Sequence, residues 1–174
     1  MLITQEYKRL NSILHDDVPG YGTSGYKKAS LIEGVIEQAK AKTLLDYGAG
    51  KQTLKPVLSK LIDYRAYDPC IEGIDSPPEI ADVVVCTDVM EHVEPECVDS
   101  VLAHVFSLTQ KAAVFSICCE VGSRLLANGK PAHCSVHPAG WWVSKLEQFG
   151  KVQIKPNITR AKELVCVVWV KGKT

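Results

Sequence analysis

The sequence predicts one α/β domain of three layers, in which helices cover both faces of a mostly parallel β-sheet. Two observations predict this fold. Amphipathic helical segments alternate along the chain with short apolar segments, as they do in consecutive βαβ units. In addition, the segment TLLDYGAG at residues 43–50 is a strand followed by two glycines. Glycines at this place let the backbone approach a ligand closely at the carboxyl end of a parallel strand.

Length and charge set the broad class. The 174 residues suit one domain that buries about 70% of its unfolded surface. Neither an internal repeat nor a linker composition divides them, so residues 1–174 are expected to form a single domain. The 20 Lys and Arg residues balance the 20 Asp and Glu residues. No overall field therefore attracts the chain to nucleic acid or to an anionic membrane.

The cysteines and the first residues bear on the compartment. The seven cysteines form no CxxC pair, which favours reduced thiols and a cytoplasmic protein. The opening residues MLITQEYKRLN lack the apolar stretch of a signal peptide. No apolar run approaches the roughly 18 residues of a membrane span, so no membrane partner is expected.

The first half of the chain begins with a helix from about residue 26 to 42, before the strand at 43–47. A second helix should follow the glycine turn, with Pro56 in its first turn. The apolar residues expected to face the sheet are Leu31, Ile32, Val35, Ile36 and Ala39 in the first helix, and Leu54, Val57, Leu58 and Leu61 in the second.

Strands are next expected at residues 64–67 and 81–86. Only about a dozen residues separate Asp68, which follows the first of these strands, from Ala81. That length is too short for the usual helix plus strand. The fold is therefore expected to be shortened between the second strand and the strand at Ala81.

The second half continues the alternation, with a helix at 98–108 and a buried strand at 112–118. After a polar stretch, a helix at 141–149 leads to two late strands near 152–155 and 164–170. The two late strands are close enough in sequence to pair antiparallel. The C-terminal edge of the sheet should therefore be antiparallel.

Two acids stand where such a sheet binds ligands. Asp68 follows Asp46 by 22 positions and ends the second strand, where a carboxylate can accept hydrogen bonds from both hydroxyls of a ribose. Asp88, in CTDVMEHVEPE, falls at the end of the third strand. Open α/β sheets bind ligands at this carboxyl edge.

Three motifs, LLDYGAG, YDP and ADVVVCTDVMEHVEP, follow one another in this order and spacing. Together they resemble the class I S-adenosylmethionine-dependent methyltransferases, over about residues 29–118. The resemblance implies a Rossmann-like methyltransferase fold, S-adenosylmethionine as cofactor and S-adenosylhomocysteine as product. It implies that the glycine turn passes beneath the methionine part of the cofactor and that Asp68 holds the ribose. The cofactor-binding residues expected by match are Asp46, Tyr47, Gly48, Ala49, Gly50, Asp68, Pro69, Thr87, Asp88 and Val89. Asp75 is a candidate for the adenine end, although a solvated loop acid is the more economical interpretation.

The segment PGYGTSGYKKA belongs to residues 1–28, which resemble the lid that such enzymes often fold over the cofactor. Tyr21, Gly22 and Tyr26 are expected to cover its methionine end, together with Thr23. A flexible leader is the alternative interpretation.

Histidines suit proton removal near neutral pH. His133 matches a histidine that many family members carry before a late helix, so it is the preferred general base; His92 and Asp88 complete the catalytic candidates. His15 and His104 are not expected near the cleft. His137 and Trp141 are the substrate-binding candidates, because an indole can stack on a planar acceptor.

A metal site is the sharper alternative. Asp88, Glu91 and His92 have i, i+3 and i+4 spacing, which would place them on one helix face, and His133 could join them. This set is similar to the metal-binding motif of the small-RNA 2′-O-methyltransferases. A zinc site from His133, Cys134 and His137 lacks a fourth ligand at a suitable spacing. Metal-free catalysis is favoured.

The acceptor is expected to be a small molecule, since the chain shows no interleaving of aromatic and basic residues. An RNA or nucleoside methyltransferase is the alternative, and a non-catalytic cofactor-binding protein and a nicotinamide-dependent oxidoreductase are two others. The sequence carries no signal for the oligomeric state.

Overall fold

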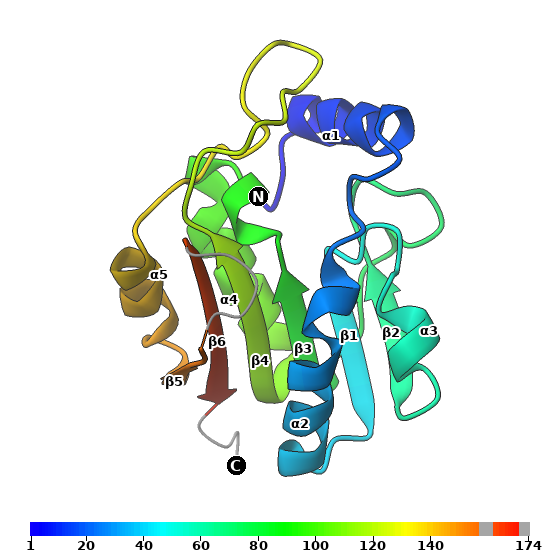
Figure 1. Ribbon diagram of the computed structural model, residues 1–174, viewed down its shortest axis with the longest axis vertical. Helices are drawn as coiled ribbons and strands as arrows, with labels where there is room; N and C mark the ends of the chain where they lie inside the picture. Colours follow the sequence, from blue (N-terminus) through cyan, green and yellow to red (C-terminus); the bar gives the residue numbers. More distant parts are fainter. Residues whose placement is uncertain (157–161, 171–174) are drawn as a thin grey trace.

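A computed structural model describes residues 1–156 and 162–170 of the chain. Within these residues the strands form one six-stranded sheet in the order β2-β1-β3-β4-β6-β5 (Figure 1). Neighbours from β2 to β4 are parallel, whereas β6 runs antiparallel to both β4 and β5. The mostly parallel sheet with an antiparallel C-terminal edge is therefore confirmed. The strands are β1 (Thr43–Tyr47), β2 (Asp63–Tyr67), β3 (Ala81–Thr87), β4 (Thr109–Cys118), β5 (Gly150–Ile154) and β6 (Glu163–Val170).

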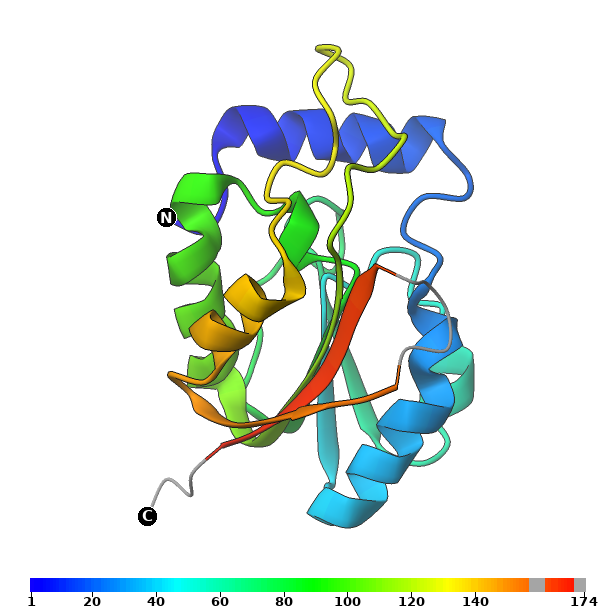
Figure 2. The same ribbon diagram turned by 60° about the vertical axis from the view of Figure 1, so that its left-hand side comes forward.

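Helices cover both faces of this sheet, as Figure 2 shows: α2 and α3 lie on one side, and α4 and α5 on the other. The α-helices are α1 (Gln5–Asp17), α2 (Ala29–Ala39), α3 (Lys55–Leu58), α4 (Val98–Leu108) and α5 (Ala139–Leu146). Three short 3₁₀ helices are η1 (Gly25–Lys28), η2 (Met90–His92) and η3 (Pro95–Cys97). No described helix has the length and apolar character needed to cross a membrane.

The apolar run of β3 explains why helices pack on both sides of the sheet. Val83 and Val85 pack in the cluster that includes Ile32 of α2, whereas Val84 packs in the cluster of α4 and α5, which includes Trp142. Successive side chains of a strand point to opposite faces. A strand that is apolar at every position is therefore buried on both.

The helix expected after the glycine turn is shorter than predicted. The α-helix is limited to α3, with Pro56 in its first turn as expected. Leu54 and Leu58 are buried, but Val57 and Leu61 are 39% and 60% exposed. After Leu58 the chain turns at once toward β2, so only one apolar turn reaches the sheet. Residues 68–80 form a loop without a helix, and the predicted shortening before β3 is confirmed.

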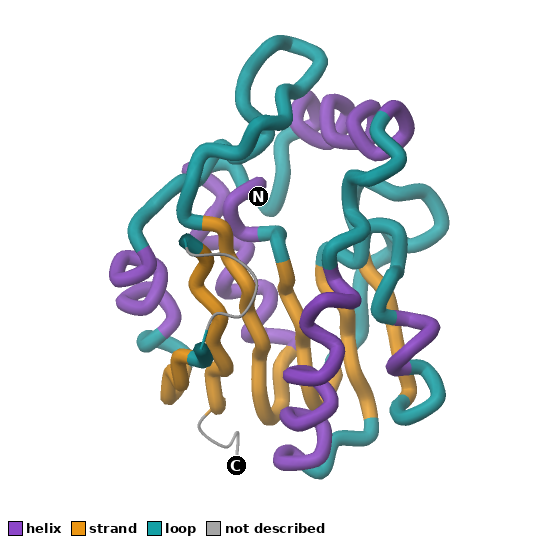
Figure 3. The backbone as a smooth tube through the Cα atoms, viewed as in Figure 1, coloured by secondary structure: helices purple, strands orange, loops and turns teal. Residues whose placement is uncertain are grey.

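Helix α1 was not predicted, and it lies across the carboxyl edge of the sheet (Figures 1 and 3). Its buried residues Tyr7, Leu10 and Leu14 pack against Leu126 and Ala132 from the segment between β4 and α5. The side chain of Thr4 caps the helix by accepting a hydrogen bond from the Tyr7 N–H. We call residues 1–28 the lid segment.

Candidate active site

A cavity of about 250 Å³ lies beneath α1, at the carboxyl ends of the first three strands. The strand order reverses between β1 and β3, and open α/β sheets bind ligands at such a switch point. The lining comes from the lid segment and from the loops after β1, β2, β3 and β4. It includes the predicted residues Tyr21, Gly22, Thr23, Asp46, Tyr47, Gly48, Ala49, Gly50, Asp68, Pro69, Thr87, Asp88, Val89, Glu91, His92 and His133.

The glycine turn forms the floor of this cavity, and two of its positions require glycine. Gly48 and Gly50 have φ angles of +76° and +51°, which residues with a Cβ atom rarely adopt. A Cβ atom on Gly48 would lie 2.3 Å from a methyl of Val89, and one on Gly50 would lie 2.6 Å from the carbonyl oxygen of Gly22. The turn is therefore packed tightly between the β3 loop and the lid segment.

Asp68 is buried at the end of β2 and is held by the backbone. Its Oδ2 accepts a hydrogen bond from the Gly50 N–H at 3.1 Å, and its Oδ1 accepts one from the Cys70 N–H at 3.0 Å. A carboxylate has about four acceptor positions, so both oxygens can still accept from a ligand in the cavity. The arrangement suits a pair of hydroxyl donors.

Asp46 is also buried, but its surroundings differ. Its Oδ2 accepts a hydrogen bond from the Tyr64 hydroxyl at 2.5 Å. Burial raises the pKa of Asp46 to about 7, the Tyr64 hydrogen bond lowers it, and the nearby Asp68 raises it further. Asp46 therefore carries less than a full charge at neutral pH. Its hydrogen bond with Tyr64 links β1 to β2.

Asp88 does not lie on the helix face that it was predicted to share with Glu91 and His92. Its φ of +55° lies in the left-handed region, and only Met90–His92 form a short 3₁₀ helix behind it. The Asp88 carboxylate accepts hydrogen bonds from Ser24 of the lid segment and, at 3.0 Å, from Ser116 of β4. The expected shared face of Asp88, Glu91 and His92 is therefore absent from this part of the structure.

Ser116 connects Asp88 to a buried ion pair between Glu163 and Lys28. The Ser116 hydroxyl lies 2.9 Å from Glu163 Oε1, and Glu163 Oε2 lies 2.9 Å from the Lys28 ammonium. Both charged side chains are over 90% buried. The network links the end of the lid segment to β4 and β6, and it reaches the cavity through Asp88.

His92 and His133 meet edge to face, with ring centroids 4.6 Å apart. The Nδ1 of His133 lies 2.8 Å from the Glu120 carbonyl oxygen, and the Nδ1 of His92 lies 2.9 Å from the Ala132 carbonyl oxygen. Because a carbonyl only accepts, each Nδ1 carries the proton. In the neutral tautomer with this proton, the Nε2 of His133 is the acceptor, as a general base requires.

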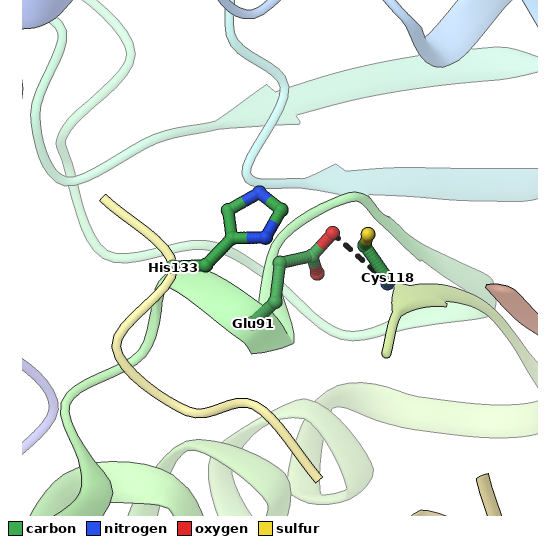
Figure 4. Close-up of side chains that lie close together, drawn as sticks. All are labelled: Glu91, Cys118 and His133. Atoms are coloured by element: carbon green, nitrogen blue, oxygen red, sulfur yellow. Dashed lines mark hydrogen bonds between the residues drawn. The ribbon is translucent and has the colours of Figure 1, made fainter. Parts of the chain in front are cut away.

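Glu91, Cys118 and His133 offer donor atoms that all lie within 4.8 Å of one another (Figure 4). Glu91 Oε1 also accepts a hydrogen bond from the Cys118 N–H at 3.0 Å. Carboxylate, imidazole and thiolate are all zinc ligands, so this trio could hold an ion. It differs from the predicted set, since Cys118 joins it and Asp88 and His92 do not.

Other predicted residues lie outside the cavity lining. Tyr26 is 54% exposed. His137 stacks on Trp141 with ring centroids 3.8 Å apart, and it lines a second hollow beside Glu163. Asp75 is exposed and pairs with Lys8 at 3.5 Å.

Some lining residues were not predicted. Tyr7, Asn11 and His15 line the cavity from α1, and Glu94 and Arg124 line it from the loops after β3 and β4. The placement of His15 corrects the expectation that this residue lies away from the cleft. The spacing of four residues along α1 was a signal in the sequence. It could be interpreted only once this segment was known to be a docked helix.

The sequence matches no protein-family model, and no curated protein matches it either. Solved structures do match its fold. The 1,6-didemethyltoxoflavin-N1-methyltransferase of Burkholderia thailandensis, with 1,6-didemethyltoxoflavin and S-adenosylhomocysteine bound, gives a TM-score of 0.63 at 16% identity, over 98% of this chain and 91% of that chain. The DhpI–SAH complex gives a TM-score of 0.63 at 17% identity, over 97% and 95% of the two chains. The chain has the class I methyltransferase fold.

Other proteins with the methyltransferase fold extend the comparison. The methyltransferase domain of bacterial CtHen1-CN gives a TM-score of 0.61 at 14% identity, over 83% of this chain and 98% of that chain. Some are longer: the chain spans 58% of an O-methyltransferase family protein from Burkholderia thailandensis and 50% of the mitomycin 7-O-methyltransferase MmcR. At these identities the comparison establishes the fold alone.

Proposed function

We propose that the chain is an S-adenosylmethionine-dependent methyltransferase that acts on a small molecule. The observation that carries this proposal is the joint placement of the glycine turn and Asp68 under the lid segment, at the switch point of the sheet. Structural neighbours solved with S-adenosylhomocysteine or SAM bound support it.

In this proposal the cofactor lies along the carboxyl edge of the sheet. Its methionine part rests on Gly48, Ala49 and Gly50, between Asp46 and Tyr47 on one side and Thr87, Asp88 and Val89 on the other. Asp68 and Pro69 hold the ribose, and Tyr21 and Gly22 cover the cofactor from above. All of these residues line the same cavity.

Methyl transfer from a sulfonium is an in-line displacement. The sulfur–methyl bond breaks, its electron pair stays on sulfur, and the acceptor atom forms a bond to the methyl carbon. Most of the rate comes from alignment of the two reacting atoms. An acceptor that must lose a proton would give it to the Nε2 of His133, whose Nδ1 is held by the Glu120 carbonyl.

The size of the cavity supports a small acceptor. Its volume is about 250 Å³, below the roughly 300–1,000 Å³ of typical ligand sites, and the acceptor shares it with the proposed cofactor. Helix α1 lies across the carboxyl edge of the sheet (Figure 1), and its residues Tyr7, Asn11 and His15 line the cavity. The bound 1,6-didemethyltoxoflavin of one neighbour is likewise a small molecule. An RNA acceptor has no comparable support in the described residues.

Calorimetry with S-adenosylhomocysteine tests cofactor binding. We expect the wild type to bind this ligand and not NADH, and Asp68→Asn to weaken binding roughly 10- to 100-fold, because a hydrogen bond to a charged group contributes about 1.5–3 kcal/mol. Glu72→Gln is the matched control, since Glu72 is an exposed acid of the same loop. Absence of binding to the wild type would overturn the proposal.

Transfer itself is tested with a labelled methyl group offered to pools of small molecules and of RNA. Once an acceptor is found, His133→Ala should lower kcat about 10²- to 10⁴-fold if that acceptor must lose a proton. The affinity for S-adenosylhomocysteine should stay unchanged. His137→Ala should keep full turnover, because His137 lies outside the cavity. Full turnover by His133→Ala would show that His133 is not the base.

A further inference from the structure

Three polar side chains form a row on the underside of α1. Tyr7, Asn11 and His15 are spaced by four residues, and all three line the cavity. Residues at this spacing share one helix face, and eight residues span about 12 Å along the axis. The row therefore runs along the roof of the cavity.

The first two members of the row have partners within the protein. The Tyr7 hydroxyl donates a hydrogen bond to the Ala132 carbonyl at 3.0 Å. Asn11 Oδ1 accepts one from the Tyr21 hydroxyl at 3.0 Å. By contrast, the Nδ1 of His15 is buried and has no hydrogen-bond partner among the described residues.

His15 lies at the cofactor end of the row. Its ring edge lies 2.8 Å from the position that a Cβ atom of Gly22 would take, and Gly22 itself packs on Gly50. The Tyr21 ring holds the imidazole edge to face, with centroids 4.6 Å apart. His15 is therefore fixed above the glycine turn.

The charges around His15 come from both the sheet and α1. Burial lowers the pKa of His15 and outweighs the nearby Asp68, which raises it; Lys51 and Asp16 have smaller effects in opposite directions. At neutral pH the ring is therefore uncharged, with one N–H donor and one acceptor nitrogen. A neutral imidazole can hydrogen-bond a hydroxyl through either nitrogen.

His15 lines the cavity from the lid side, and Asp68 lies close enough to act on it electrostatically from the sheet side. We propose that His15 is a second contact for the cofactor ribose, placed on the lid side of the cavity opposite Asp68 on the sheet side. This inference rests on the proposed cofactor. It makes the last turn of α1 part of the cofactor site instead of only a cover.

The test compares ligands with and without each ribose hydroxyl on two proteins. S-adenosylhomocysteine and its 2′-deoxy and 3′-deoxy analogues are titrated into the wild type and His15→Ala. His15→Ala should bind S-adenosylhomocysteine about 10-fold more weakly. The penalty that the wild type shows for one of the deoxy analogues should shrink by a similar factor in the variant, because the partner of that hydroxyl has been removed.

Asp17→Ala is the matched control, since Asp17 is an exposed residue of the same helix turn; its affinities should equal those of the wild type. Should His15→Ala not fold, His15→Leu refills the apolar volume and enters the same comparison. If the wild type binds no S-adenosylhomocysteine, the proposed function fails. If the wild type binds it and the variant shows the same affinity or the same deoxy penalties, only the role of His15 is overturned.

Discussion

At the scale of single residues, two carboxyl groups at the ends of neighbouring strands are built for different tasks. Asp68 accepts hydrogen bonds from two backbone N–H groups, which fix the orientation of its carboxylate. Asp46 is more deeply buried, has one hydroxyl donor, and has its pKa raised to about 7. Asp68 is thus suited to hold a ligand, whereas Asp46 is suited to hold the first two strands together.

The raised pKa of Asp46 predicts a pH-dependent stability. Folding raises this pKa from its ordinary value of 3.8 to about 7, so the folded protein keeps a proton that the unfolded chain releases within this interval. Stability should therefore fall as the pH rises toward 7, by roughly 2–3 kcal/mol between pH 5 and pH 8. Asp46→Asn should lack this component in urea unfolding at the two pH values. An equal pH dependence in both proteins would contradict the shift.

Many residues of the cavity lining could be predicted at this scale, and the reason is geometric. Gly48, Asp68 and Asp88 each follow a parallel strand, so the sheet alone brings them to one edge. His15 could not be predicted, because its position depends on how α1 docks. His137 and Trp141 were expected at the cavity, but they stack on each other at the start of α5 instead.

At the scale of elements, the glycine turn is the most constrained part of the chain. Gly48 has a positive φ, and Val89 fills the space where its side chain would be. Gly73, in the β2–β3 loop, has a φ of +88°, but a Cβ atom added there would have nothing within 4 Å. Substitutions at these two glycines therefore distinguish the cost of the left-handed backbone from the cost of side-chain overlap.

Gly48→Ala should destabilise the fold by about 1–2 kcal/mol for the left-handed conformation, plus roughly 1–3 kcal/mol for overlap with Val89. It should also weaken binding of S-adenosylhomocysteine, because the β3 loop has to move. Gly73→Ala should show only the first cost, with unchanged affinity. Urea unfolding and calorimetry measure both effects. Equal losses in the two variants would mean that Val89 moves aside without cost.

The strands and helices that could be predicted from the sequence are those with an apolar face buried in the core. Strands β3 and β4 were predicted because both faces are apolar, and α2 and α4 because each has one apolar face. Helix α1 was missed because it packs on a loop and a cavity, so its apolar stripe is only Tyr7, Leu10 and Leu14. Its docking could not be inferred from local periodicity.

At the scale of the whole molecule, the lid segment bonds to every loop that borders the cavity. The Gly22 carbonyl accepts from the Lys51 N–H at 2.8 Å after β1, and the Ser12 hydroxyl donates to the Cys70 carbonyl at 2.8 Å after β2. After β4, the Tyr7 hydroxyl donates to the Ala132 carbonyl. The lid segment is therefore bonded along the whole carboxyl edge of the sheet that borders the cavity.

The remaining anchor, after β3, joins the start of α1 to Glu94, whose carboxylate accepts hydrogen bonds from the N–H of Thr4 at 2.8 Å and from its hydroxyl at 2.7 Å. Two such bonds contribute roughly 1–2 kcal/mol when part-exposed, so Glu94→Ala should speed amide hydrogen exchange in α1 about 5- to 30-fold while exchange in β3 and β4 stays unchanged. Glu96→Ala, which removes an exposed acid two residues later, should leave α1 as in the wild type. Unchanged exchange in Glu94→Ala would mean that the other three loops hold α1 without this anchor.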